Sequence, residues 1–280
     1  MVGHHFTMEL AKRHRIVTAS KSSGTTDYRI DASRAAELEM AVRGCRPELV
    51  VNAVKPPLST DGMEKYREAA YALNAALPER LAALGKKYGF TLVQISTDWV
   101  YPGERGEIYS EQSLTYPKNY YAHTKMLGEE RAWHISGGKC LVLRTEGVFG
   151  YDNRGSNIFL RLKNAKKAGK PVFAASDQYS QPIYGGELAR LASRLLEKGK
   201  TGIFNAVGRD YLSRLEFVRA ACRRFAFEAR VAPYSAVSRG LRIPQYLKVD
   251  VRKVERIAGR IRPLGRQFDE LEHEWLEWES

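Results

Sequence analysis

The sequence predicts an α/β fold in which a doubly wound parallel sheet is joined to a smaller mixed α/β lobe. Up to about residue 150, short apolar runs alternate with amphipathic stretches, which is the pattern of strands and crossover helices. The apolar run at residues 90–95 ends in the polar pair Ser96-Thr97. Ligands bind beyond the carboxyl ends of the strands in open sheets of this type, so this pair marks a candidate site.

The individual elements follow from the periodicity along the chain. Apolar runs predict strands at residues 16–20, 28–31, 49–54, 90–95, 139–144 and 201–208. Amphipathic stretches predict helices at residues 4–14, 31–44, 74–88, 120–133, 185–197, 213–225 and 268–278. Gly44 is the expected end of the second helix, and Pro78 is compatible with an early turn of the third. The helix at 213–225 is expected to bury an apolar stripe made of Leu215, Val218, Cys222 and Phe225.

The predicted helix at 120–133 carries Tyr121 and Lys125, and a spacing of four places both side chains on one face. A tyrosine has an unperturbed pKa of about 10, and a neighbouring cation favours its phenolate and eases proton release. Lys125 is the candidate cation, and the hydroxyl of Thr97, or of its neighbour Ser96, is the candidate to hold the oxygen that receives the proton. This set suits reduction of a carbonyl by a bound nicotinamide. Such a pair also arises by chance on helices, so the strand and loop before it carry the inference.

Two longer segments are more specific. I-S-T-D-W-V-Y-P-G, from Ile95, and N-Y-Y-A-H-T-K-M-L-G-E, from Asn119, resemble the S-T-D-Y-V-F-x-G and N-x-Y-G-x-[ST]-K-x-x-G-E segments of the dTDP-4-dehydrorhamnose reductases. These enzymes belong to the extended short-chain dehydrogenase/reductase superfamily. The resemblance covers nearly the whole chain and implies a Rossmann-type fold with Thr97, Tyr121 and Lys125 as catalytic residues. It also implies NAD(P)H-dependent reduction of a 4-keto nucleotide sugar.

The resemblance places Tyr121 and Lys125 at the cofactor as well as at the substrate. By alignment with the family pattern, Gly3 is the last glycine of a phosphate-binding fingerprint. Asp31 is expected near the adenine, or as a cap of the helix that follows it. The remaining cofactor contacts are expected from Asn52, Ala53, Val54 and Asn74, the last of which either supports the site through water or only caps its helix.

The choice between NADP and NAD depends on the loop after residues 16–20. An acidic side chain there would bond the ribose hydroxyls of NAD, and this loop has none. Ser20 and Lys21 suit the additional phosphate of NADP, although a lysine in a polar loop can also simply be solvated. NADP is therefore the expected cofactor, with NAD as the alternative.

The N-terminus departs from the family pattern. A dinucleotide-binding fold opens with an apolar strand that leads into a glycine-rich turn at a helix N-terminus. This sequence has only Met1, Val2 and Gly3 before the first helix, so that strand and the two earlier glycines are absent from it. The strand should be central in the sheet, and its neighbours would lose a pairing partner. We expect either that the sequence begins at an internal methionine of a longer protein or that the chain is a degenerate relative.

Substrate contacts are implied after residue 145. Residues 176–189 resemble the D-Q-x-G-x-P-T segment that lies beside the sugar nucleotide, which makes Gln178, Tyr179 and Gln181 candidates. Residues 242–253 occupy the place of the R-P-x-x-S-x-L-D-x-x-K segment, so Arg242 is expected to face the diphosphate, which its planar fork can bind. Glu146 and the glycine after it stand where the reductases often have Ser-Trp, which weakens the assignment to rhamnose in particular.

The regular alternation ends at Tyr151, which divides the chain into two expected parts. Residues 1–150 and 183–210 form the expected dinucleotide-binding domain, and residues 151–182 and 211–280 form the expected substrate-binding lobe. The chain has a net charge of +13, and residues 211–266 contain 14 Lys or Arg and four acidic residues, a net charge of +10. Such a lobe suits a nucleotide-diphosphate sugar. Nucleic acid is not an expected partner, because no motif that binds it is present.

Three further features bound the class of protein. No apolar run approaches the roughly 20 residues that span a bilayer, and no signal peptide is visible, so a cytoplasmic protein without a membrane partner is expected. The three cysteines (Cys45, Cys140, Cys222) are far apart and include no Cys-x-x-Cys pair. We therefore expect reduced thiols and no metal site. A homodimer is left open.

Two rival functions share this fold. The first is a non-catalytic nucleotide-binding or regulatory subunit, or a truncated pseudoenzyme, which the missing phosphate cradle favours and the intact trio of Thr97, Tyr121 and Lys125 opposes. The second is a nucleotide-sugar epimerase or dehydratase. The sequence around Thr97 and Tyr121 resembles that of the reductases, which favours a reductase over that second rival.

Overall fold

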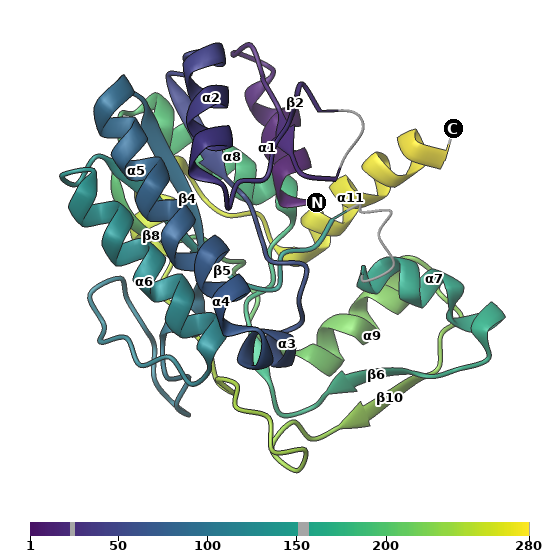
Figure 1. Cartoon of the computed structure of the whole chain (residues 1–280). Coiled ribbons are helices and arrows are strands. Elements are labelled where there is room, and N and C mark those ends of the chain that lie inside the picture. The colour runs from purple at the N-terminus through teal and green to yellow at the C-terminus, as the bar shows by residue number, and fades with distance from the viewer. Residues whose placement is uncertain (23–25, 151–156, 280) are drawn as a thin grey trace.

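A parallel sheet forms the centre of the computed structural model, which describes residues 1–22, 26–150 and 157–279 (Figure 1). Its strands are β3 (Leu49–Asn52), β4 (Thr91–Thr97), β5 (Cys140–Thr145) and β8 (Gly202–Asn205), in the order β3-β4-β5-β8. Every neighbouring pair is parallel. The carboxyl ends of all four strands therefore lie at one edge, and the prediction of a doubly wound parallel sheet is confirmed.

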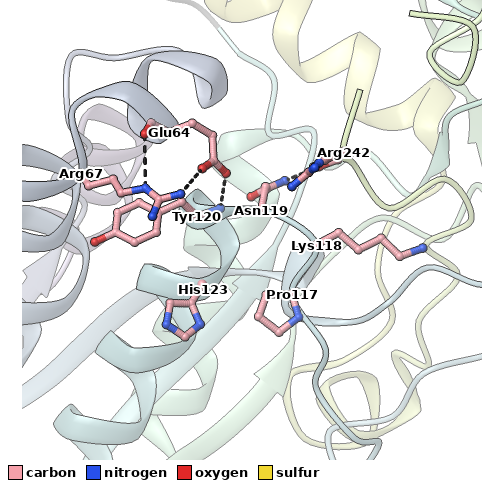
Figure 2. Close-up of a pocket in the computed structure, with 8 residues that line it drawn as sticks. All are labelled: Glu64, Arg67, Pro117, Lys118, Asn119, Tyr120, His123 and Arg242. Carbon is pink, nitrogen blue, oxygen red and sulfur yellow. Dashed lines mark hydrogen bonds and ion pairs between the residues drawn. The ribbon is translucent and has the colours of Figure 1, made fainter. Parts of the chain in front are cut away.

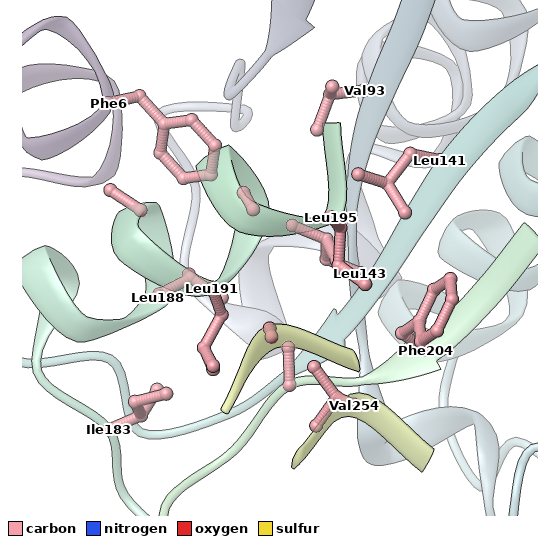
Figure 3. Close-up of a cluster of buried hydrophobic side chains, with 14 of the residues drawn as sticks. Phe6, Val93, Leu141, Leu143, Ile183, Leu188, Leu191, Leu195, Phe204 and Val254 are labelled. Atoms are coloured by element: carbon pink, nitrogen blue, oxygen red, sulfur yellow. The ribbon is translucent and has the colours of Figure 1, made fainter. Parts of the chain in front are cut away.

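Helices cover both faces of this sheet because successive side chains along a strand point to opposite faces. On one face, Val93, Leu141 and Leu143 pack with α1 (Val2–Leu10), α8 (Gly185–Glu197) and α10 (Arg252–Ala258) (Figure 3). On the other face, Leu92 and Val142 pack with α2 (Ala35–Cys45), α5 (Leu77–Tyr88) and α6 (Tyr120–Ile135). The alternation of these strand residues builds two apolar cores from one sheet.

Helix α6 packs closely against a helical run made of three pieces. These are α4 (Arg67–Tyr71), the π-helical turn η1 (Ala72–Ala76) and α5, in which Pro78 occupies the first turn. At Gly128 of α6, an added Cβ atom would lie 2.1 Å from the carbonyl oxygen of Asn74. Only a glycine allows the two backbones to approach this far, so Gly128 fixes the position of α6.

A smaller lobe lies beside the carboxyl edge of the sheet (Figure 1). Its core is aromatic and includes Phe149, Phe159, Phe217, Phe268 and Trp275. The elements that supply it are α7 (Ile158–Ala168), β6 (Val172–Ala175), α9 (Arg214–Arg224), β10 (Val231–Tyr234) and α11 (Leu264–Glu279). Strands β6 and β10 pair in parallel, whereas β7 (Tyr179–Ser180) and β9 (Leu212–Ser213) pair antiparallel. The stripe predicted on α9 contributes to this core, with Leu215 and Val218 buried.

The sheet is interrupted on the N-terminal side of β3. Strands β1 (Ala19–Ser20) and β2 (Tyr28–Arg29) pair with each other and form a separate two-stranded sheet. Among the described residues, no strand pairs with the edge of β3 that faces away from β4. Leu49, Val50 and Val51 are accordingly only partly buried. The expectation that neighbouring strands lack a partner agrees with this interruption.

Two sequence-based predictions about elements were wrong. Helix α2 does not end at Gly44, because its C-cap is Arg46 in the left-handed region, with φ of 46°. Gly44 instead lies inside the helix, where an added Cβ would come within 2.8 Å of the Tyr28 hydroxyl. Asn74 does not cap a helix either, since it lies within η1 in the middle of the helical run.

Candidate functional site

The three predicted catalytic residues lie at the carboxyl edge of the sheet. Thr97 is the last residue of β4, and Tyr121 and Lys125 lie one turn apart on α6. Helix α6 begins there because the side chain of Asn119 accepts a hydrogen bond from Ala122 N. Thr97 Oγ1 accepts a hydrogen bond from Trp99 N at 3.2 Å, which leaves the hydroxyl hydrogen for another acceptor. The indole of Trp99 meets the ring of Tyr121 edge-on.

The environment keeps Tyr121 protonated. Burial raises the pKa of Tyr121 to about 12, a hydrogen bond with Thr97 opposes this shift, and the carboxyl groups of Asp98 and Glu146 add to it. Burial lowers the pKa of Lys125 to about 8, against the effect of Glu129. In the protein alone the pKa of Tyr121 thus lies above its ordinary value, which is opposite to the direction that the sequence predicts. The Lys125 ammonium donates to the carbonyl oxygen of Ile95.

A buried ionic network lies one helical turn beyond Lys125 on α6. Glu129 lies one turn further along α6 and pairs with Arg144 of β5 at 2.8 Å. Ser96 donates a hydrogen bond to the Glu129 carboxylate, and Arg144 also donates to the Tyr101 hydroxyl at 2.8 Å. Both charged side chains are almost completely buried. Ser96, the alternative to Thr97 in the sequence, thus belongs to this network.

Two further carboxyl groups, those of Asp98 and Glu146, act on Tyr121 through their charges. Asp98 is completely buried, and neither of its carboxylate oxygens has a partner among the described residues. Glu146 Oε1 lies 3.6 Å from Arg214 Nη1, while Glu146 Oε2 is buried and unpartnered in the same part of the chain. Burial and the charge of Glu146 raise the pKa of Asp98 well above its ordinary value.

The predicted cofactor residues at the amino-terminal side form two groups. In the first, an added Cβ on Gly3 would lie 3.8 Å from Cβ of Ala53, so α1 starts above the end of β3. In the second, Lys21 Nζ forms an ion pair with Asp31 Oδ2 at 2.7 Å. A hydrogen bond from Lys21 is the main reason that the pKa of Asp31 lies well below its ordinary value.

The two predicted asparagines have different surroundings. Asn52, at the end of β3, donates to Gln94 Oε1 at 2.8 Å and accepts from Val54 N at 3.3 Å. Asn74 donates to Thr124 Oγ1 at 3.0 Å, directly before Lys125 in the sequence. The amide oxygen of Asn74 is buried without a partner among the described residues. That oxygen is a suitable acceptor for a water or a ligand hydroxyl near Lys125.

The predicted substrate residues around β7 differ in their exposure to solvent. Tyr179 is partly exposed, and its ring lies between those of Tyr211 and Tyr246, with centroids 5.6 and 5.7 Å away. Gln178 is also partly exposed. Gln181 is buried, donates to Gly208 O at 2.9 Å and accepts from Val249 N at 2.7 Å. Both ends of the Gln181 amide are thus engaged with backbone, so its placement indicates a structural role.

Arg242 lies on another side of α6. It lines a pocket of about 240 Å³ together with residues that flank the start of this helix (Figure 2): Glu64, Arg67, Pro117, Lys118, Asn119, Tyr120 and His123. The pocket, as described, includes none of the other predicted substrate residues. Glu64 already occupies the helix start, since Oε1 accepts from Tyr120 N at 2.6 Å. The chain segment that follows Arg242 does meet Tyr179, because Tyr179 N donates to Gln245 O at 2.6 Å.

Several residues of the site had no predicted role. Asp98 was visible in the motif directly after Thr97, and Glu129 ends the second motif, but neither motif shows what contacts these side chains. Arg144 and Arg214 gave no local signal, because each reaches its acidic partner only through the fold. The described residues contain no group of three or more His, Cys, Asp or Glu that could hold a metal ion, and the three cysteines are free.

Comparison with known proteins identifies the family of this chain. The family model described as the RmlD substrate binding domain matches residues 1–269. The dTDP-4-dehydrorhamnose reductase of Streptomyces griseus is 30% identical over 211 residues, which cover 74% of this chain and 67% of that relative. The enzyme of the same name from Escherichia coli strain K12 is 32% identical over 164 residues, 59% of this chain and 53% of the relative. The match thus spans about half the length of the latter.

Solved structures of similar proteins share the fold. A dTDP-4-dehydrorhamnose reductase from Clostridium acetobutylicum has a TM-score of 0.86 at 22% identity and covers 98% of this chain and 96% of its own. A dTDP-4-dehydrorhamnose reductase from Bacillus anthracis in complex with NADP has a TM-score of 0.79 at 23% identity, with 88% and 87% covered. Because the family model spans nearly the whole sequence, the chain belongs to the RmlD substrate binding domain family.

Proposed function

We propose that this protein reduces a 4-keto nucleotide sugar with NADPH, as a dTDP-4-dehydrorhamnose reductase does. One arrangement carries the proposal: Thr97 ends β4 at the carboxyl edge of the sheet, and Tyr121 and the buried Lys125 lie one turn apart on α6. This is where ligands bind in open α/β sheets. The names of the relatives in Streptomyces griseus and Escherichia coli support the same reaction.

The chain supplies the proton and positions the carbonyl. Tyr121 keeps its proton near neutral pH because its pKa is raised, and it is therefore ready to donate to the keto oxygen as negative charge develops there. The Thr97 hydroxyl, whose lone pair already accepts from Trp99 N, donates a second hydrogen bond to that oxygen. Lys125 supplies positive charge one turn away on α6, which stabilises the phenolate left behind.

The residues present fit NADPH at its two ends. Lys125 donates to Ile95 O, and an ammonium carries three donors, so it can also bind the ribose next to the nicotinamide. Lys21 is largely exposed and can reach the additional phosphate, although its ion pair with Asp31 competes. Gly3, at the start of α1, is the residue that would adjoin the pyrophosphate, and Asn52, Ala53 and Val54 lie at the neighbouring strand end. When bound, NADPH supplies the hydride.

Substrate binding is proposed at the small-lobe side of the edge. Tyr179 offers an aromatic surface, Gln178 a neighbouring amide, and Glu146 a carboxylate close to Tyr121. Two solved relatives of this fold contain UDP or UDP-glucose, which supports a nucleotide sugar as ligand. We propose residues 1–150 and 183–210 as the dinucleotide-binding part, together with α10, whose Val254 packs in the same core. The expected substrate-binding lobe begins at Tyr151, which lies outside the described residues.

No helix in the described part of the chain is long and apolar enough to cross a bilayer. A cytoplasmic location and a homodimer are further predictions. The rival reading as a nucleotide-binding subunit without activity is favoured by one observation, the interrupted sheet beside the expected pyrophosphate position. That rival would bind a nucleotide sugar but reduce none.

The experiment that tests the function is a comparison of the purified protein with Tyr121→Phe and Tyr120→Phe. NADPH oxidation is followed with dTDP-4-keto-6-deoxy sugars as substrates. Loss of the general acid should lower turnover by at least about 10²-fold in Tyr121→Phe. Tyr120, on another side of α6, is the matched control, and its replacement should leave turnover unchanged. Full activity of Tyr121→Phe would contradict the assignment, and nucleotide-sugar binding without reduction by the unchanged protein would favour the rival.

A further inference from the structure

Tyr121 lies in the first turn of α6, the part of a helix that is least held by its own hydrogen bonds. It is the second residue of the helix, after Tyr120. The first N–H groups of a helix have no intrahelical acceptor, and helix ends fray. A general acid has to stay within about 2.6–3.2 Å of the oxygen that it protonates. The start of α6 therefore needs other groups to hold it in place.

Two side chains bind the backbone at this helix start. The Asn119 side chain accepts from Ala122 N at 2.9 Å and donates to Arg242 O at 2.9 Å. The N–H of Tyr120 is bound from outside the helix, by Glu64 Oε1 at 2.6 Å (Figure 2). A carboxylate in this position also interacts favourably with the positive end of the helix dipole. Glu64 thus holds the residue that directly precedes the proposed proton donor.

Glu64 is itself fixed by its neighbours. It belongs to the short helix α3 (Thr60–Lys65), and its Oε2 atom pairs with Arg67 Nη2 at 3.1 Å. The preceding residue, Met63, is 1% exposed, and its sulfur lies 3.6 Å from Asn74 Nδ2. Asn74 is part of the helical run that packs against α6. The Glu64 carboxylate is therefore placed against α6 by the packing of the residues around it.

We propose that Glu64 positions Tyr121 for proton transfer by holding the first N–H of α6. This inference rests on the proposed reductase function. Glu64 acts through the backbone of Tyr120, so it is a positioning residue. The ring of Tyr121 meets that of Trp99 edge-on, with centroids 5.8 Å apart, and a displaced first turn would change this contact. Lys125 lies a turn further into the helix, so loss of the bond should affect proton transfer more than ligand binding.

The positioning can be observed without substrate or cofactor. NMR spectra of protein with ¹⁵N- and ¹³C-labelled tyrosine report the Tyr120 amide and the Tyr121 ring, and replacement of each tyrosine by phenylalanine assigns the signals. Glu64→Ala should speed hydrogen exchange of the Tyr120 amide by about tenfold or more. It should also move the Tyr121 ring signals, because the ring shifts relative to the Trp99 indole. The matched control is Glu68→Ala, an exposed carboxylate of α4, which should leave both unchanged. Unchanged Tyr121 signals in Glu64→Ala would overturn the proposal.

Steady-state kinetics separate positioning from a general loss of structure. Glu64→Ala should lower kcat by about tenfold or more and change KM for the keto sugar and for NADPH by less than about twofold. Glu64→Gln keeps an acceptor oxygen for Tyr120 N and should recover most of the lost kcat, and Glu68→Ala should match the unaltered protein. A joint change in kcat and KM, or no recovery with glutamine, would overturn positioning through this bond. A protein that reduces no keto sugar would overturn the reductase function, and the ring signals would still decide whether Glu64 positions Tyr121.

Discussion

At the scale of single residues, Lys125 couples the site to the stability of the fold. Its pKa lies at about 8 in the folded protein because of burial, against an ordinary value of 10.5. Below about pH 8 the folded state carries an ammonium that its surroundings disfavour, while the unfolded chain carries it at no cost. Between about pH 8 and about pH 10.5 the folded state releases this proton first, so the free energy of unfolding rises with pH.

Lys125→Met should remove this dependence. Urea unfolding at about pH 7 and about pH 10 gives the free energy of unfolding of both proteins. The difference between the unaltered protein and the variant should move in favour of the unaltered protein by about 2–3 kcal/mol over that range. Comparing the two proteins cancels the titration of other groups. An equal pH dependence in both would show that Lys125 is not charged at a cost in the folded state.

The residues of the site differ in how far the sequence could reveal them. Tyr121 and Lys125 were predictable because a spacing of four on one helix is local information. The pKa shift of Tyr121 was predicted in the wrong direction, because burial and Asp98 act across elements that no spacing describes. Gln181 matched a family segment, yet its amide binds Gly208 O and Val249 N, which are distant in sequence. The sequence thus pointed to the candidate residues, but not to the groups that surround them.

At the scale of elements, the contact between α6 and η1 positions the trio. Gly128→Ala should destabilise the protein, because the added Cβ meets Asn74 O and neither backbone can move aside cheaply. The expected loss is about 1–3 kcal/mol, even though alanine is a better helix former than glycine by about 1 kcal/mol. Turnover should also fall, since a shift of α6 moves Tyr121. Urea unfolding and steady-state kinetics measure the two effects.

Gly265 provides the matched control. It lies in the first turn of α11, and an added Cβ there meets no atom within 4 Å. Gly265→Ala should therefore leave stability unchanged or raise it by about 0.5–1 kcal/mol. If both alanine variants behaved alike, the close approach at Gly128 would not be what holds α6.

The element pattern explains which helices and strands were predictable. Helix α8 agrees with its expected range, 185–197, because a long amphipathic period is a strong local signal. Strands β6 and β10 were missed, since each has four residues and they pair across a long stretch of chain. The end of α2 was misplaced because Gly44 serves close packing against Tyr28, a use of glycine that resembles a helix stop in sequence.

At the scale of the whole molecule, the two lobes position different parts of the site. The sheet and its two apolar cores hold Thr97, Tyr121 and Lys125, and the aromatic core of the small lobe holds α9, which brings Arg214 to Glu146. The interruption next to β3 lies beside Gly3 and Ala53. The proposed catalytic residues therefore lie on a continuous part of the sheet. The proposed pyrophosphate position lies beside the interruption.

The charge of the molecule bears on how it captures an anionic ligand. The net charge is +13, and part of the basic excess in the C-terminal region is internally paired, as Arg224 is with Asp269 and Glu272. Arg214 is exposed at the small-lobe side of the site, next to Glu146. A positive field acts on a diphosphate over a distance that shrinks with salt, from about 10 Å at about 0.1 M to about 3 Å at about 1 M.

Affinity for dTDP should consequently fall by about tenfold or more between about 0.1 and about 1 M NaCl. Thymidine has the same base and sugar without the diphosphate, so its affinity should change little over this range. Calorimetric titration of both ligands gives the two dissociation constants at each salt concentration. If dTDP kept its affinity in high salt, the positive charge would contribute nothing to capture. An equal loss for dTDP and thymidine would instead mean that salt acts on the base or on the fold, and the basic lobe would need another role.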